Sequence, residues 1–234
     1  MRRGILGLLV LVLATVGAPA RADATYGSVT GVSGVLYDDC LSYPYRYAVT
    51  PPAGARDWDV SVVLIGPDGK QADTDFVSTE VLSGTSWFVL CQPTNLFGRY
   101  TIRATFEWLD ADSAWQSSAL ADSSFTMRKP RSRTTLSAST RRPAYGQRVA
   151  FRIGAADENP SGYVPQAFAW VHLEKRRDGH WVRIRGSRAV THASGYVKVR
   201  VRYLKHHHRT MRVRAVTEPT TRYARSVSPV IRLW

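Results

Sequence analysis

Apolar and polar residues alternate along most of this 234-residue chain, and almost no stretch has the spacing of an amphipathic helix. The clearest example is residues 99–108, RYTIRATFEW, in which every second residue is apolar. Successive side chains of a strand point to opposite faces, so an alternation of period two predicts a strand with one buried face. Gly, Pro, Asp and Asn interrupt these runs where turns are expected. The pattern predicts an all-β chain.

Runs of this kind recur through both halves of the chain. They cover residues 45–49, 58–65, 86–90, 99–108 and 124–127 in the first half, and 134–139, 148–153, 168–175, 180–185, 195–203, 211–217 and 227–233 in the second. Asp178 and Gly179 lie between two of these runs and are typical of a hairpin turn, because Gly tolerates a positive φ. Short strands separated by turns over roughly 100 residues are typical of a β-sandwich. We therefore expect two tandem β-sandwiches.

The first 24 residues have the three parts of a secretory signal peptide. Arg2 and Arg3 precede an apolar run at residues 5–16, and small residues then offer cleavage sites after Ala22 or Ala24. The run is shorter than the roughly 20 apolar residues of a membrane span, and no later stretch is long and apolar enough to cross a bilayer. We therefore expect a secreted or extracellular protein without a transmembrane segment after the leader, with association with the cell wall left open.

The chain contains two cysteines, Cys40 and Cys91, and no Cys-x-x-Cys spacing. In an exported protein an even pair favours a disulfide over a metal or catalytic site. A bridge that closes a loop of this length stabilises a fold by roughly 4 kcal/mol in the chain-entropy model. Both cysteines lie in the first half, which indicates that this half is its own folding unit.

The net charge of +14 is distributed unevenly. Residues 24–127 contain five basic and twelve acidic residues (−7), whereas residues 128–234 contain 24 basic and five acidic residues (+19). This contrast favours two domains, at 25–128 and 134–234 with a linker at 129–133, and an anionic partner for the second. Arg outnumbers Lys by 27 to 5, so the codon usage of a GC-rich genome is an alternative explanation for the excess.

Strand-and-turn patterns recur in the second half at residues 134–139, 145–149, 171–176, 179–182, 193–196 and 211–215. In these patterns the second half resembles the bacterial Ig-like modules of secreted and surface proteins from GC-rich Gram-positive bacteria. The resemblance covers most of residues 134–234 and implies a fold, not an activity, so we expect two tandem immunoglobulin-like β-sandwiches. The first half is similar only in style. Its Cys40, Trp58 and Cys91 follow the order of an immunoglobulin core, but Tyr100 comes after Cys91 instead of two residues before it. This departure argues against the usual bridge between two sheets, although not against a disulfide.

Cationic residues alternate with apolar ones along several predicted strands of the second half. Because the apolar members should face a sandwich core, the cationic members should form rows on the outside. Arginine suits phosphate and carboxylate groups, because its planar guanidinium binds them at two points. The candidate polyanion-binding residues are Arg183, Arg185, Lys198, Arg200, Arg202, Arg212 and Arg214. An immunoglobulin arrangement would place strands 195–203 and 210–217 in different sheets and split this patch.

Three consecutive histidines, His206 to His208, suggest a metal site, but their spacing and the surrounding charge argue against it. In an extended segment only the first and third of them could converge, and a zinc site needs three or four ligands. The neighbouring residues are cationic, which opposes the binding of a metal ion. We expect a solvated basic loop at this position.

Signatures of catalysis and of cofactors are lacking in the sequence. There is no Gly-x-Ser-x-Gly, His-Glu-x-x-His, phosphate loop or dinucleotide fingerprint, and residues 24–127 contain no histidine. Aspartate pairs such as Asp110 and Asp112 do not match a calcium loop. Trp108 and Trp115 flank a polar loop and offer a carbohydrate- or protein-binding edge, although core packing is the favoured interpretation. We expect no enzyme, no cofactor and no metal.

The sequence therefore predicts a secreted, non-enzymatic Ig-like envelope protein that acts in adhesion, as a scaffold or as a binding module. The alternative is an electrostatic binder of anionic polymers through the basic second domain. The ligands considered for it are a wall polymer, an anionic lipid and nucleic acid, of which a specific nucleic-acid partner is the least expected. An envelope protein or an anionic wall polymer is the expected partner. The oligomeric state is left open.

Overall fold

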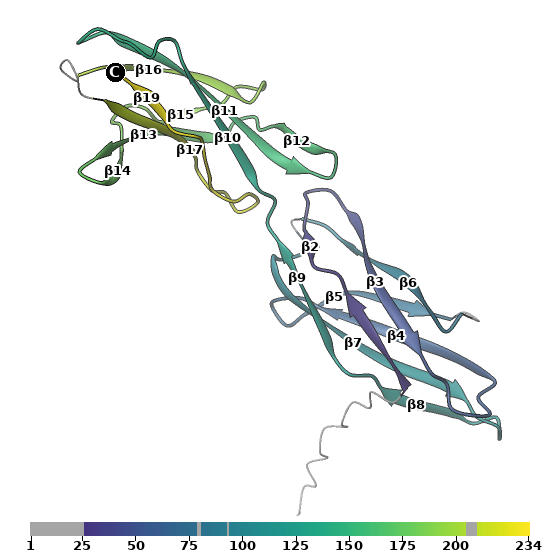
Figure 1. The fold of residues 1–234 in the computed structure, drawn as a ribbon. Helices are drawn as coiled ribbons and strands as arrows, with labels where there is room; N and C mark the ends of the chain where they lie inside the picture. Colours follow the sequence, from purple (N-terminus) through teal and green to yellow (C-terminus); the bar gives the residue numbers. More distant parts are fainter. Residues whose placement is uncertain (1–25, 79–80, 93, 205–209) are drawn as a thin grey trace, which may run out of the picture.

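The structure is a computed structural model that describes residues 26–78, 81–92, 94–204 and 210–234. These residues form strands, turns and loops, with no α-helix among them, so the predicted all-β class is confirmed. The strands build two β-sandwiches that follow one another along an elongated molecule (Figure 1). The predicted signal peptide and the run from His206 to His208 lie outside the described residues.

The first sandwich packs a three-stranded sheet against a larger one. The smaller sheet has the order β1-β3-β6, with β1 at Gly27–Gly31, β3 at Leu41–Val49 and β6 at Ser83–Leu90. The larger sheet has the order β2-β9-β7-β4-β5, and β8 pairs with β7. Its strands are β2 (Gly34–Val35), β4 (Asp57–Ile65), β5 (Gln71–Val77), β7 (Gly98–Leu109), β8 (Trp115–Ala119) and β9 (Ser123–Arg128). The alternating apolar residues of both sheets, including Tyr45, Phe88 and Phe106, form one buried core.

The second sandwich also consists of two sheets. The β11 sheet contains β10 (Ser132–Ala138), β11 (Arg148–Asn159), β12 (Gly162–Pro165) and β16 (Tyr196–Arg202). The β13 sheet contains β13 (Trp170–Arg177), β14 (His180–Arg183), β15 (Ala189–Val190), β17 (Met211–Thr217), β18 (Ser226–Val227) and β19 (Ile231–Leu233). A second cluster of buried residues lies between them and includes Phe151, Ile153, Leu173 and Val213.

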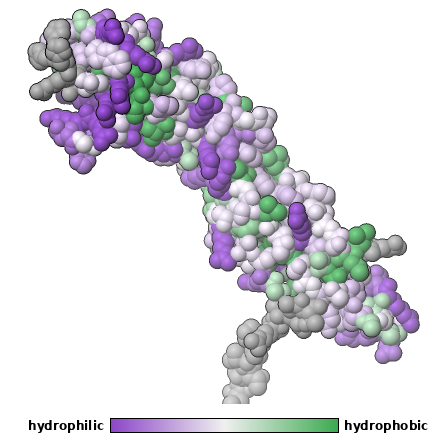
Figure 2. All heavy atoms as spheres, viewed as in Figure 1, coloured by the Kyte–Doolittle hydropathy of each residue, from purple (hydrophilic) through white to green (hydrophobic). Residues whose placement is uncertain are grey.

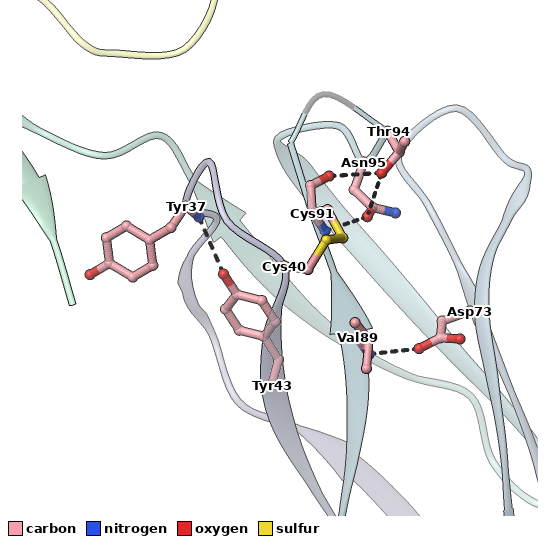
Figure 3. Close-up of a disulfide and its surroundings, with 8 residues drawn as sticks. All are labelled: Tyr37, Cys40, Tyr43, Asp73, Val89, Cys91, Thr94 and Asn95. Atoms are coloured by element: carbon pink, nitrogen blue, oxygen red, sulfur yellow. Dashed lines mark hydrogen bonds between the residues drawn. A yellow bond between two sulfur atoms is a disulfide. The ribbon is translucent and has the colours of Figure 1, made fainter.

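The predicted disulfide between Cys40 and Cys91 is present, with a Cα–Cα distance of 4.1 Å (Figure 3). Cys40 directly precedes β3 and Cys91 directly follows β6, and Leu41 pairs with Leu90 in the ladder of these two strands. The bridge therefore closes the end of one antiparallel pair instead of joining two sheets. This geometry agrees with the unusual position of Tyr100, whose hydroxyl donates to the carbonyl of Leu96 at 2.6 Å.

Polar contacts connect the two sandwiches where β9 leads into β10. Only residues 129–131 separate these strands, since Ser132 already pairs with β11. The guanidinium of Arg128 donates two hydrogen bonds to the carboxylate of Glu158, at 2.7 and 2.8 Å. The hydroxyl of Tyr223 donates to Asp38 at 2.9 Å. These contacts hold the ends of the two sandwiches together.

Candidate polyanion-binding face

The seven cationic residues that the sequence singles out lie on both sheets of the second sandwich. Lys198, Arg200 and Arg202 are exposed on β16, which pairs with β11. Arg212 and Arg214 lie on β17, which pairs with β13 in the other sheet. Arg183 ends β14, and Arg185 follows in the adjoining turn. The predicted patch is therefore split between two sheets, as the immunoglobulin arrangement requires.

Three further arginines complete a cationic surface on the outside of the β11 sheet. Arg148 lies opposite Arg202, and Arg152 lies opposite Lys198, in the ladder of β11 and β16. Arg133 of β10 lies opposite Ala156 of β11. Ala156 is an even number of residues from Arg148 and Arg152, so Arg133 lies on the same outer face as these two arginines. We call this surface the β11 face and define it by its six exposed cations, which are Arg133, Arg148, Arg152, Lys198, Arg200 and Arg202. Sequence reasoning missed the three from β10 and β11, because their strands carry single cations instead of dense rows.

Within the described ranges, the cations of the β11 face have no carboxylate partner, because none of the six forms a salt bridge there. The two acids of β11, Asp157 and Glu158, lie near the end of the strand and accept hydrogen bonds from Ser132 and Arg128. Burial raises the pKa of Asp157 to about 6, and hydrogen bonds from Arg128 lower the pKa of Glu158 to about 2. Like charges opposite each other on neighbouring strands cost stability, so this face would gain from an external anion.

The outer face of the β13 sheet is different, because it carries its own carboxylates. Arg214 donates to Glu174 at 2.7 Å, and Arg188 donates to Glu218 at 2.7 Å. The pKa of Glu218 is lowered, mainly by the hydrogen bond from Arg188. His172 lies between the two glutamates, 3.0 Å from Glu218 and 3.5 Å from Glu174. These contacts neutralise much of the β13 face internally.

Two tryptophans also cover cations on the β13 face. The guanidinium of Arg214 lies 4.2 Å from the ring centroid of Trp181, and that of Arg188 lies 3.9 Å from that of Trp170. Arg212 and Arg232 pair in the ladder at the far end of this sheet, and Arg176 lies on β13 near the same end. All three are exposed and form no salt bridge among the described residues. This smaller group is the natural comparison for the β11 face.

Trp108 and Asp110, two of the remaining sequence candidates, have structural roles. Trp108 packs against the first core and stacks on Phe106 at a centroid distance of 5.2 Å, whereas Trp115 is exposed. Asp110 caps its turn by accepting the backbone N–H of Ala114 at 2.9 Å. The described residues contain no group of three or more His, Cys, Asp or Glu side chains that could hold a metal ion. In the same residues, no helix has the length and apolar character needed to cross a membrane.

Comparisons with known proteins reveal no relative by sequence. No family model and no curated protein matches the chain. Many solved structures show a weak similarity of fold. A tetra-tandem repeat from the extending region of a large adhesion protein matches with a TM-score of 0.32 and 11% identity, over 88% of this chain and 48% of that one. A Salmonella alpha-2-macroglobulin mutant matches with a TM-score of 0.34 and 14% identity, over 97% of this chain and 16% of that one.

The fibronectin(III)-like modules of Clostridium thermocellum CbhA give a TM-score of 0.30 and 12% identity, over 88% of this chain and 92% of that one. The chain thus spans about half of the adhesion-protein repeat and a sixth of the macroglobulin. At these scores the similarities identify no family. The function has to be argued from the residues of this chain.

Proposed function

We propose that this chain is a non-enzymatic binding module that holds an anionic polymer on the β11 face. The observation that carries the proposal is the set of six exposed cations, from three neighbouring strands, without a carboxylate partner in the described chain. An uncompensated surface of this kind is unfavourable alone and favourable against a polyanion. Five of the six are arginines, whose forked guanidinium suits phosphate and carboxylate groups.

The proposed setting is outside the cell, at or beyond the envelope. The predicted signal peptide at residues 1–24 supports export. The disulfide between Cys40 and Cys91 supports the same setting, because such bridges persist in oxidising compartments. In this proposal residues 25–128 and 134–234 are separate domains, supported by two buried clusters that share no residue. The second domain binds, and the first acts as a support.

Adhesion to a protein is a second candidate, favoured by an exposed apolar group on the first sandwich. Trp87 and Val89 point outward from β6, and Pro44 lies opposite Trp87 in the ladder with β3. Val81 and Leu82, just before β6, are also exposed. Figure 2 shows a group of apolar residues on the surface of the first sandwich, near its right edge. Exposed apolar patches of monomeric proteins often mark contact sites.

The test compares two triple variants that remove the same charge from the two sheets. Lys198→Gln, Arg200→Gln and Arg202→Gln change the β11 face, whereas Arg176→Gln, Arg212→Gln and Arg232→Gln change the β13 face. Binding of the full chain to immobilised polyphosphate is measured from low to moderate salt. We expect the first triple variant to bind more weakly and to lower the log–log salt slope by about 2, at about 0.7 per lost contact.

The control variant should keep most of the affinity and the slope. Equal losses in both triple variants would mean that net charge alone drives binding, which contradicts a site on the β11 face. Failure of the unaltered chain to bind polyphosphate and purified cell wall at any salt would reject polyanion binding and leave protein adhesion. In that case Trp87→Ala becomes the informative variant.

A further inference from the structure

A trough of about 340 Å³ lies on the β11 face, between the first residue of β16, Tyr196, and the last residue of β12, Pro165, which pair with the same edge of β11. Its volume falls in the range of ligand sites in proteins, roughly 300–1,000 Å³. The lining residues are Arg133, Thr135, Gly154, Ala155, Ala156, Tyr163, Pro165 and Tyr196. Two tyrosines, a guanidinium and small apolar side chains therefore surround it, next to the row that starts at Lys198.

The ring of Tyr196 is held in place by a glycine and an arginine. A Cβ atom on Gly154 would lie 2.6 Å from Cε1 of Tyr196 and 2.5 Å from Oγ1 of Thr135, so both side chains lie over the bare backbone of this residue. The guanidinium of Arg152 stacks on the same ring, 4.0 Å from its centroid. An aromatic ring fixed on the sheet surface loses little conformational entropy when a ligand stacks on it.

The second ring comes from Tyr163 on β12 and is flanked by another cation. The guanidinium of Arg133 lies 5.9 Å from its centroid. The hydroxyls of Tyr163, Tyr196 and Thr135 have no hydrogen-bond partner within the described residues. Three hydroxyls and two aromatic rings thus border one hollow, and the hydroxyls remain available to a ligand.

We propose that this trough binds a sugar ring of an acidic polysaccharide, an inference that rests on the proposed function. The apolar C–H face of a sugar ring packs on aromatic rings, and its hydroxyls pair with the free hydroxyls of Thr135, Tyr163 and Tyr196. The lining contains no Asn, Gln, Asp or Glu side chain of the kind that reads the edge of a nucleobase. The chemistry of the trough therefore favours a sugar over a base.

The rest of the polymer follows the cations away from the trough. Lys198, Arg200 and Arg202 succeed one another at every second residue of β16, which places neighbouring charges about 6.7 Å apart. Arg152 and Arg148 run beside them on β11. The acidic groups of the following sugar units bind to these two rows, so the trough selects the ring and the rows supply charge attraction.

The experiment uses two full-length double variants and three polymers. Tyr163→Ala with Tyr196→Ala removes both rings of the trough, and Phe76→Ala with Trp234→Ala removes two exposed aromatic residues that do not line the trough, as a control. The probes are polygalacturonate, which has acidic sugar rings, polyphosphate, which has no ring, and poly(dT). The tyrosine variant should bind polygalacturonate roughly tenfold more weakly and polyphosphate unchanged, while the control variant is unchanged on both.

Two results overturn the inference while polyanion binding stands. The first is an equal affinity of the tyrosine variant and the unaltered chain for polygalacturonate, with polyphosphate still bound. The second is a loss confined to poly(dT), which would assign the trough to nucleobases. If the unaltered chain binds neither polygalacturonate nor polyphosphate, the proposed function itself is wrong. Far-ultraviolet circular dichroism of each variant separates a lost contact from a lost fold.

Discussion

The two outer faces of the second sandwich are both rich in arginine, yet they handle that charge differently. The β13 face brings Glu174 and Glu218 among its cations and pairs them with Arg214 and Arg188. The β11 face holds six cations, and its acids are buried or paired at one end. A count of basic residues cannot separate these faces, whereas the position of the carboxylates does. The β11 face, whose cations have no carboxylate partner among the described residues, is therefore the candidate for binding.

The largest effect on stability is expected from removing a carboxylate that pairs with an arginine on the β13 face. The side chains of Glu174 and Arg214 are largely buried, with exposed fractions of 13% and 21%. Glu174→Gln therefore leaves the guanidinium of Arg214 partly buried and without its counter-ion. We expect the free energy of unfolding to fall by about 2 kcal/mol, measured by urea denaturation. Asp178→Asn removes the same charge from an exposed pair with Arg177 and should change stability little. Similar effects of the two changes would mean that Glu174 does not stabilise this face.

An intermediate effect is expected from the two acids of β11, which should respond to pH in opposite ways. Asp157 has a pKa raised by burial to about 6, against about 3.9 in an unfolded chain. The folded state therefore holds an extra proton between these values, and stability falls as pH rises through this window. Asp157→Asn removes the cost of charging and should raise the free energy of unfolding by about 1–2 kcal/mol at pH 7.5, but not at pH 4.

The neighbouring Glu158 should show the opposite dependence of stability on pH. Its pKa is lowered by Arg128 to about 2, so its contribution is present above about pH 4.3 and is lost as pH falls toward 2. Glu158→Gln should lower the free energy of unfolding by about 1 kcal/mol at pH 7.5, and the difference should vanish near pH 2. Neither change should alter binding to polyphosphate. A change in that affinity would show that these acids belong to the β11 face after all.

The smallest effect is expected from relieving repulsion on the β11 face. Arg200→Thr removes one cation from an exposed row and places a residue with high β-propensity on the strand. We expect the free energy of unfolding to rise by roughly 0.5 kcal/mol while polyphosphate binding weakens. Thermal or urea denaturation beside a binding titration measures both. A loss of stability together with a loss of binding would argue that the β11 face is not under electrostatic strain.

Much of the fold could be predicted, because alternation is a local property of the sequence. The long strands β4, β7 and β17 coincide with predicted runs almost to the residue. Strand β5, QADTDFV, was missed because its aspartates suggest a loop. Asp73 instead accepts a hydrogen bond from the backbone N–H of Val89 on strand β6 (Figure 3). Asp75 accepts one from the hydroxyl of Ser86 on the same strand. Such a role depends on a partner strand that a local pattern does not reveal.

The candidate site was only partly predictable for the same reason. The cationic rows of β16 and β17 follow from alternation, but which residues face them depends on the order of strands in each sheet. Arg152 lies opposite Lys198, 46 residues later, and Glu174 neutralises Arg214 from 40 residues away. The trough needs Gly154, Tyr163 and Tyr196 from three strands. Pairings over such distances are set by the tertiary fold, and a single sequence does not specify them.

The position of the disulfide has a consequence for a chain that is pulled. Cys40 and Cys91 are 51 residues apart, and they join the ends of β3 and β6, so all of β3 to β6 lies inside the closed loop. Tension applied along the backbone passes through the sulfur atoms and bypasses this loop. About 170 Å of extended chain, at roughly 3.4 Å per residue, therefore stays unavailable when the first sandwich gives way. The bridge sets an upper limit on how far the molecule can lengthen under load.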